Sequence, residues 1–210
     1  MKIGIISDTH GSVECWRMAF EKFFSEADLI FHAGDVLYHG PRNRMTDGYR
    51  PVQLVEEIEQ CNVPIIAARG NCDSEVDASV LSIPLASPYA FAFVNGKRIV
   101  ITHGHFTETQ EEKVRMAARF KADIFISGHT HVSDLKRVGG TIFLNPGSPS
   151  LSKLGRPLDG RPDGRAFCGR PRFIYRRDFG PSPDGVRTRW IFCAKRRRTT
   201  SAFTRRSRRN

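Results

Sequence analysis

The sequence feature that most constrains the fold is a short apolar run that ends in a small residue and then Asp, Asn or His. The run Ile3–Ile6 is the first example, and Ser7-Asp8-Thr9-His10 follows it directly. Four more runs end in the same way, at Gly34-Asp35, Gly70-Asn71, Thr102-His103-Gly104-His105 and Gly128-His129-Thr130-His131. Such runs are typical of buried strands, and sites in α/β sheets form where strand carboxyl ends release the chain into loops. The five strand ends can therefore converge on one site.

The chain between these strand ends predicts an α/β protein with mixed sheets, because β-α-β alternation comes first and hairpins follow. Apolar residues at helical spacing predict helices over about residues 13–26, 51–61 and 109–122. Turn signals at Asn95-Gly96 and Gly139-Gly140 predict two hairpins. The expected strands are residues 2–6, 29–33, 63–68, 90–94, 98–102, 123–127, 135–138 and 141–145.

Charge divides the chain into two parts. Residues 1–153 hold 16 Lys and Arg against 18 Asp and Glu, whereas residues 154–210 hold 17 basic and 4 acidic residues. We therefore expect one domain over 1–153 and an atypical Arg-rich C-terminal segment over 154–210. Three interpretations of this segment stay open: a frame-shifted end, a divergent but folded end in which 170–177 and 186–194 are strands, and a disordered basic arm that binds RNA or DNA through its phosphates.

The remaining composition predicts a cytoplasmic protein with no membrane partner. No apolar stretch approaches the roughly 18 residues of a spanning helix, and the first residues lack a signal-peptide pattern. The cysteines are odd in number and form no C-x-x-C pair, which argues against a disulfide framework and a structural zinc site. They are Cys15, Cys61, Cys72, Cys168 and Cys193.

The polar residues at the strand ends predict a metal site. Neutral His nitrogen with charged Asp oxygen suits Mn²⁺, Fe or Zn²⁺ better than Ca²⁺. Two metals need about seven or eight ligand contacts, and a bridging Asp35 would supply the eighth. The seven candidate ligands are Asp8, His10, Asp35, Asn71, His103, His129 and His131. Each motif alone is also compatible with a turn or loop start, but five of the seven histidines lie at three of these strand ends.

The order D-x-H, G-D, G-N, H-G-H, G-H-T-H resembles that of the calcineurin-like metallophosphoesterase superfamily. The stretches GDVLYHGPRN and RGNCDSEVD resemble its small bacterial YfcE-like phosphodiesterase subfamily, and the resemblance covers about residues 1–151. It implies a four-layer α/β/β/α sandwich of two mixed β-sheets flanked by helices, with a dinuclear metal site at the strand carboxyl ends. The subfamily resemblance favours two Mn²⁺ ions, with Fe, Zn²⁺ and Ni²⁺ as alternatives.

The resemblance also implies roles for the ligands. The first metal would bind Asp8, His10, Asp35 and His131. Asp35 would bridge to the second metal, whose other ligands would be Asn71, His103 and His129. The implied enzyme is a phosphoric diester hydrolase in which a metal-bridging hydroxide attacks a small phosphodiester. Asp35, Asn71 and His103 would be its catalytic residues.

Four further residues are predicted to contact substrate. Arg42 and Asn43 are candidates to hold a phosphate, since Arg offers a bidentate fork; a solvated loop is the alternative. Cys72 stands where many family members have a histidine after G-N, which removes a proton donor and favours a diester with a good leaving group. His105 would contact substrate or metal, or else make a supporting hydrogen bond.

Two other functions and two partners stay open. A branch of the family, the small retromer subunit, acts as a protein-interaction scaffold and tends to lose one of the metal-ligating residues. Asp35 and Asn71 are both present here, which favours an enzyme. A nucleic-acid binder or nuclease would depend on the basic tail, and a homo-oligomer is also compatible with the sequence. In the NPGS segment, Asn145 and Ser148 are expected to pin a turn beneath the site.

Overall fold

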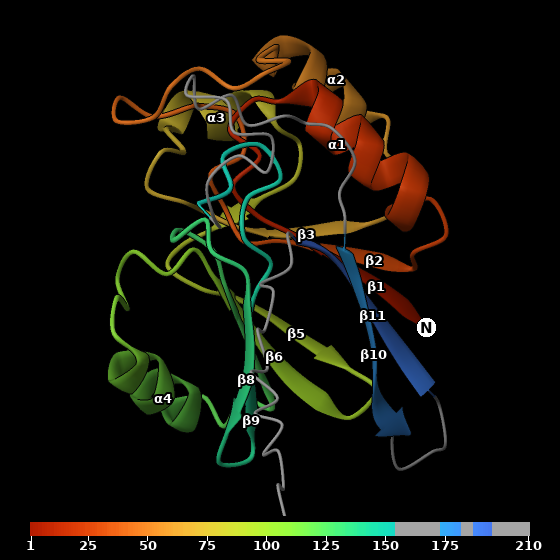
Figure 1. Ribbon diagram of the computed structural model, residues 1–210, viewed down its shortest axis with the longest axis vertical. Helices are drawn as coiled ribbons and strands as arrows, with labels where there is room; N and C mark the ends of the chain where they lie inside the picture. Colours follow the sequence, from red (N-terminus) through yellow and green to blue (C-terminus); the bar gives the residue numbers. More distant parts are fainter. Residues whose placement is uncertain (154–172, 182–186, 195–210) are drawn as a thin grey trace, which may run out of the picture.

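The computed structural model describes residues 1–153, 173–181 and 187–194, and it contains two β-sheets stacked face to face (Figure 1). The elements are β1 (Lys2–Ile6), α1 (Val13–Ala19), the π-helical turn η1 (Phe20–Phe24), β2 (Leu29–His32), α2 (Pro51–Glu59), β3 (Ile65–Ala68), α3 (Glu75–Val80), β4 (Leu85–Ala86), β5 (Ala90–Val94), β6 (Lys97–Thr102), α4 (Gln110–Arg119), β7 (Ile124–Ser127), β8 (Asp134–Val138), β9 (Thr141–Asn145), β10 (Phe173–Pro181) and β11 (Arg187–Ala194).

Both sheets are mixed. The first has the strand order β10-β11-β1-β2-β3-β4 and is parallel except for the β10–β11 pair. The second has the order β5-β6-β7-β9-β8, with an antiparallel pair at each edge. Helices α1 and α2 lie on the outer side of the first sheet, and α4 lies beside the second (Figure 1). The predicted four-layer α/β/β/α sandwich is therefore confirmed.

The uninterrupted apolar runs of the sequence follow from burial on both faces of each sheet. In β1, Ile3 and Ile5 face the core between the sheets, and Ile6 faces the core under α1 and α2. In β7, Ile126 faces the inter-sheet core while Phe125 faces α4. Side chains alternate between the two faces of a strand, so a strand that is covered on both sides needs an apolar residue at every position.

Three helices begin with the caps that their sequences encode. The Ser12 side chain caps α1, and Thr109 forms a capping box with Glu112 at the start of α4. The helix expected over residues 13–26 ends earlier, because α1 passes into η1, which ends at Phe24. Sequence reasoning missed α3 and the two-residue strand β4, although Ser74 and Asp77 form the capping box that opens α3.

Part of the Arg-rich segment belongs to the first sheet. The strands expected within 170–177 and 186–194 correspond to β10 and β11, and β11 pairs in parallel with β1 from Lys2 to Ile5. Ile191 of β11 is buried in the core under α1 and α2. The basic runs at 195–198 and 205–209, on which the nucleic-acid interpretation depends, lie outside the described residues. None of the helices in the described part of the chain combines the length and the apolar character needed to cross a membrane.

Packing against η1 gives a stability prediction. A Cβ at Gly4 would lie 2.7 Å from Cδ1 of the fully buried Phe24 ring. We expect Gly4→Ala to destabilise the fold by about 2 kcal/mol and to lower the melting temperature by roughly 4–8 °C, because a packed ring must move. The matched control is Gly140→Ala, where an added Cβ meets nothing within 4 Å. Equal melting temperatures for the two variants would contradict this packing.

Candidate metal centre

All seven predicted ligands follow the ends of five parallel strands, and Asn71 follows β3. Asp8 and His10 follow β1, and Asp35 follows β2 in the first sheet. His103 follows β6 in the second sheet, and His129 and His131 follow its neighbour β7. The carboxyl ends of neighbouring parallel strands share one sheet edge, so the two sheets present their loops to each other there.

The first ligand cluster consists of Asp8, His10 and His131, whose nearest ligand atoms all lie within 4.8 Å of one another. The Nε2 atoms of His10 and His131 are 3.1 Å apart, and Asp8 Oδ1 is 3.3 Å from His131 Nε2. The Nδ1 atoms of the two rings contact the backbone carbonyls of Tyr38 and Leu151, at 2.8 and 3.0 Å. A carbonyl can only accept, so each neutral ring carries its proton on Nδ1 and directs an Nε2 lone pair at the other ring.

The second cluster consists of Asp8, Asp35 and His103, again within 4.8 Å. His103 Nδ1 donates to the carbonyl of Ala33 at 2.8 Å, which leaves Nε2 facing Asp35 Oδ2 at 3.2 Å. Asp35 Oδ2 is also 3.7 Å from His10 Nε2. Asp35 therefore belongs to the second cluster and also faces His10 of the first, while Asp8 belongs to both clusters.

The electrostatics of the site depend on burial and on the Asp35–His103 pair. Burial opposes the charge on Asp35, but the His103 imidazole outweighs it and holds the pKa of Asp35 below its ordinary value. Burial likewise opposes the charge on His103, but Asp35 and Asp8 raise the pKa of His103 to about 9. Without a cation, a proton on His103 Nε2 thus compensates the carboxylates. A bound metal must replace that proton, because only a neutral imidazole can be a ligand.

The residues present fit a pair of divalent cations. Asp8 Oδ1 is buried and has no hydrogen-bond partner within the described residues. An unpaired buried acceptor is costly, and here several acceptor atoms point at one another. Carboxylate oxygen with imidazole nitrogen is a donor set that Mn²⁺, Fe and Zn²⁺ accept. The Nδ1 atoms of His10, His103 and His131 each contact a backbone carbonyl, as is usual for metal-ligating histidines.

The loops that carry these ligands are conformationally strained. Five candidate ligands have positive φ angles between 45° and 69°, a region that costs most residues energy. They are Asp8, His10, Asp35, His129 and His131. Strain of this kind persists only where the surroundings impose it.

Asp73, whose role sequence reasoning missed, imposes part of that conformation. Its carboxylate accepts hydrogen bonds from the backbone amides of Asp35, Val36 and Gly70, at 2.9, 2.7 and 2.7 Å. It therefore joins the loop after β2 to the loop after β3. Burial raises the pKa of Asp73 to about 6, against the lowering effect of these amides. The signal available in the sequence was an acidic residue two positions after Gly70-Asn71.

The NPGS segment supports the loops after β1 and β7. The Ser148 hydroxyl donates to the backbone carbonyl of Asp8 at 2.7 Å, and the Asn145 amide donates to the carbonyl of Gly128 at 2.8 Å. The Asn145 side chain also accepts from the amide of Gly147 at 2.8 Å. These contacts agree with the expectation that Asn145 and Ser148 pin a turn beneath the site.

The other predicted residues lie at different depths around the clusters. The His129 ring is half-buried and 5.1 Å from the His103 ring, and the His105 ring is 5.5 Å from His103. Asn71 is exposed, and its amide nitrogen is 3.4 Å from the Cys72 sulfur. The structure therefore brings His129 and His105 beside the second cluster and leaves Asn71 at its rim.

The predicted phosphate-binding residues Arg42 and Asn43 lie on the loop between β2 and α2. Arg42 is exposed, and no described contact joins it to either cluster. The Asn43 amide nitrogen donates to the backbone carbonyl of His39 at 2.8 Å. Their role in binding substrate stays a prediction.

Comparison with known proteins identifies the family. Residues 1–159 match the calcineurin-like phosphoesterase superfamily domain, so the chain belongs to that superfamily. The phosphodiesterase YfcE of Escherichia coli K12 is 37% identical over 158 residues, which cover 75% of this chain and 84% of the relative. The phosphodiesterase MJ0936 of Methanocaldococcus jannaschii is 28% identical over 154 residues, 70% of this chain and 83% of the relative. The predicted YfcE-like relationship is confirmed, and it supports a phosphodiesterase hydrolase.

A solved structure agrees with this relationship. The structure of the YfcE phosphoesterase from E. coli superimposes with a TM-score of 0.62 at 30% sequence identity. The superposition covers 88% of this chain and 95% of the solved chain. The fold and the sequence therefore point to the same relatives.

The buried residue His32 lies beneath the site and links two of its loops. His32 Nδ1 accepts from the backbone amide of Gly34 at 3.1 Å, so its proton is on Nε2, which donates to the Thr9 hydroxyl at 3.1 Å. The Thr9 hydroxyl in turn donates to the carbonyl of Val36 at 2.9 Å. Burial lowers the pKa of His32 from 6.5 to about 4, despite the opposing charge of Asp8. The ring is thus held neutral as a link between the loops after β1 and β2.

This depressed pKa predicts acid sensitivity. In the unfolded chain His32 binds a proton near pH 6.5, whereas in the folded chain it does so only near pH 4. The free energy of unfolding therefore falls as the pH drops through that window. The linked loss is about 3 kcal/mol. We expect His32→Gln, which cannot titrate, to show a shallower fall in unfolding free energy in urea titrations of the metal-free protein between about pH 7 and pH 4. Parallel curves for both proteins would rule out this role.

Proposed function

We propose that the chain hydrolyses small phosphodiesters with two divalent cations held at the strand ends. The observation that supports this most is the convergence of the Asp8, His10 and His131 acceptor atoms within 4.8 Å, with a second cluster sharing Asp8. Acceptors pack this closely only where a positive charge compensates them. The membership in the calcineurin-like superfamily gives the reaction class.

The residues would divide between the cations as follows. One cation would bind Asp8, His10 and His131, the other would bind His103, His129 and Asn71, and Asp35 would contact both. When bound, such a pair neutralises phosphoryl oxygens and lowers the pKa of a water molecule so that it can attack phosphorus. Nitrogen and oxygen ligands together leave Mn²⁺, Fe, Zn²⁺ and Ni²⁺ as candidates, and we favour Mn²⁺.

The chain's own groups position the ligands and the substrate. Asp35 is fixed by the backbone amide of Cys72, which donates to its Oδ1 at 2.8 Å. Asn71, exposed at the rim, would donate an amide hydrogen to a phosphoryl oxygen. Burial, followed by Asp35, raises the pKa of Cys72 to about 12, so its sulfur stays protonated at neutral pH and is a poor nucleophile. His105 has a buried Nδ1 without a partner among the described residues, which leaves it available to a bound ligand.

The test of this proposal is the substitution of the bridging carboxylate. We expect Asp35→Asn to lower kcat/KM for bis(p-nitrophenyl) phosphate by more than about 100-fold and to weaken Mn²⁺ binding, because one ligand charge is lost between the two clusters. Hydrolysis is measured by release of p-nitrophenol, and Mn²⁺ binding by equilibrium dialysis. The control Asp47→Asn removes an exposed carboxylate far along the loop and should change neither value.

Substrate and cation comparisons make the test specific. Wild-type protein should prefer the diester to p-nitrophenyl phosphate and lose activity after metal removal, with recovery on adding Mn²⁺. Wild-type activity in Asp35→Asn would contradict the proposed centre. A monoester preference would move the assignment to a phosphatase. Absence of turnover with Mn²⁺, Zn²⁺ and Ni²⁺ alike would favour the scaffold alternative.

A further inference from the structure

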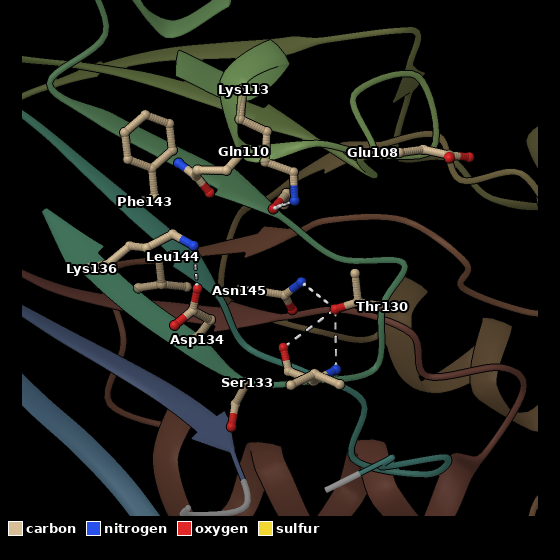
Figure 2. Close-up of a pocket in the computed structure, with 12 residues that line it drawn as sticks. Glu108, Gln110, Lys113, Thr130, Ser133, Asp134, Lys136, Phe143, Leu144 and Asn145 are labelled. Carbon is tan, nitrogen blue, oxygen red and sulfur yellow. Dashed lines mark hydrogen bonds and ion pairs between the residues drawn. The ribbon is translucent and has the colours of Figure 1, made fainter. Parts of the chain in front are cut away.

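A polar cavity lies behind the loop that carries His129 and His131. Its volume is about 540 Å³, and Figure 2 shows the side chains around it. Gln110 and Lys113 reach it from α4, Lys136 from β8, and Thr130 from the loop after β7 (Figure 2). None of these four side chains belongs to the proposed metal centre.

Among the described residues, one of the two lysines at the cavity has no carboxylate partner. Lys136 is paired with Asp134 at 2.9 Å, so its charge is compensated. Lys113 makes no ion pair within the described residues, and its ammonium contacts the Ser127 hydroxyl at 3.3 Å. Glu108, the other acidic residue at the cavity, is exposed at the rim. Burial, followed by the nearby Lys136 charge, lowers the pKa of Lys113 against the opposing charge of Asp134.

The cavity also holds an unused hydrogen-bond donor. The amide nitrogen of Gln110 is buried and has no partner among the residues that the structure describes. A half-buried ammonium and an unpaired amide nitrogen therefore both line this cavity, beside the carboxylate of Asp134. Such a set is complementary to the oxygens of an anion, which can accept from both groups at once.

The wall of the cavity is shared with the metal-binding loop. Thr130 stands between the two ligand histidines, and its hydroxyl accepts from the Asn145 amide at 3.1 Å. The same amide donates to the carbonyl of Gly128 at 2.8 Å. Ser127, which contacts Lys113, ends the strand that leads into this loop. Only the loop after β7 would therefore separate a ligand in the cavity from the proposed metal centre.

We propose that this cavity binds a phosphate oxyanion through Lys113 and Gln110. The phosphate comes either from the far end of the substrate or from a separate effector that acts on the loop after β7. In its substrate form the inference rests on the proposed function; in its effector form it does not. Lys136 and Asp134 would then border the phosphate on the β8 side.

Titration calorimetry with inorganic phosphate tests the site on the full chain, freed of metal ions and kept at constant ionic strength. We expect saturable binding that is about tenfold weaker in Lys113→Met, since one charge-assisted hydrogen bond is lost. The control Lys97→Met removes a partly exposed lysine that pairs with Asp123 at 3.8 Å, and should bind like wild type. The basic tail is present in every protein, so its contribution cancels.

Two more variants keep the test decisive if Lys113→Met folds poorly. Lys113→Arg should retain binding, and Gln110→Leu should weaken it about threefold through loss of one neutral hydrogen bond. No saturable binding by wild type, or equal affinity in wild type, Lys113→Met and Gln110→Leu, would overturn the proposal.

Hydrolysis assays with Mn²⁺ separate the two sources of phosphate. If Lys113→Met lowers kcat/KM about tenfold for a diester with a second, terminal phosphate but spares bis(p-nitrophenyl) phosphate, the substrate supplies the anion. If it affects both diesters equally while phosphate binding is lost, a separate effector supplies it. Failure of wild type to hydrolyse either diester would refute the proposed function and leave the calorimetric result to stand alone.

Discussion

The site depends on one constraint: three buried imidazoles each donate Nδ1–H to a backbone carbonyl. Tyr38, Leu151 and Ala33 supply these carbonyls to His10, His131 and His103, at 2.8, 3.0 and 2.8 Å. The Nε2 lone pairs must then face inward, toward two buried carboxylates. That arrangement is unfavourable unless a positive charge lies among the acceptors. In the metal-free protein a proton on His103 supplies this charge, and a bound metal cation would replace it.

The surrounding fold holds this arrangement against strain. Asp8 and Asp35 both have a φ of 56°, which costs a non-glycine residue energy. Ser148 holds the backbone carbonyl of Asp8, and Asp73 holds the backbone amide of Asp35. A Cβ at Gly70 would collide with Asp35 Oδ1, so the loop after β3 can approach Asp35 only because that position lacks a side chain. The packing of the two sheets therefore stabilises the strained backbone at these ligands.

Much of this was predictable from sequence because the ligands follow strand ends. Apolar runs predicted the strands that precede Asp8, Asp35 and His103, and the parallel pairing of strands brings their ends together. The role of Asp73 was not predictable, since it depends on hydrogen bonds between two loops. The pairing of β11 with β1 is likewise a contact between distant segments, which local periodicity does not encode. The passage of α1 into η1, whose Phe24 packs against Gly4, is likewise not encoded by the helical spacing of apolar residues.

We propose that the strand ends hold two cations, with Asp35 as a ligand of both. Diffraction from crystals of the protein grown with Mn²⁺, recorded at the manganese absorption edge, tests it most directly. We expect two anomalous peaks, one beside Asp8, His10 and His131 and one beside His103 and His129, with Asp35 within coordination distance of both. A map without a peak among these residues, or with peaks only elsewhere on the molecule, would contradict it.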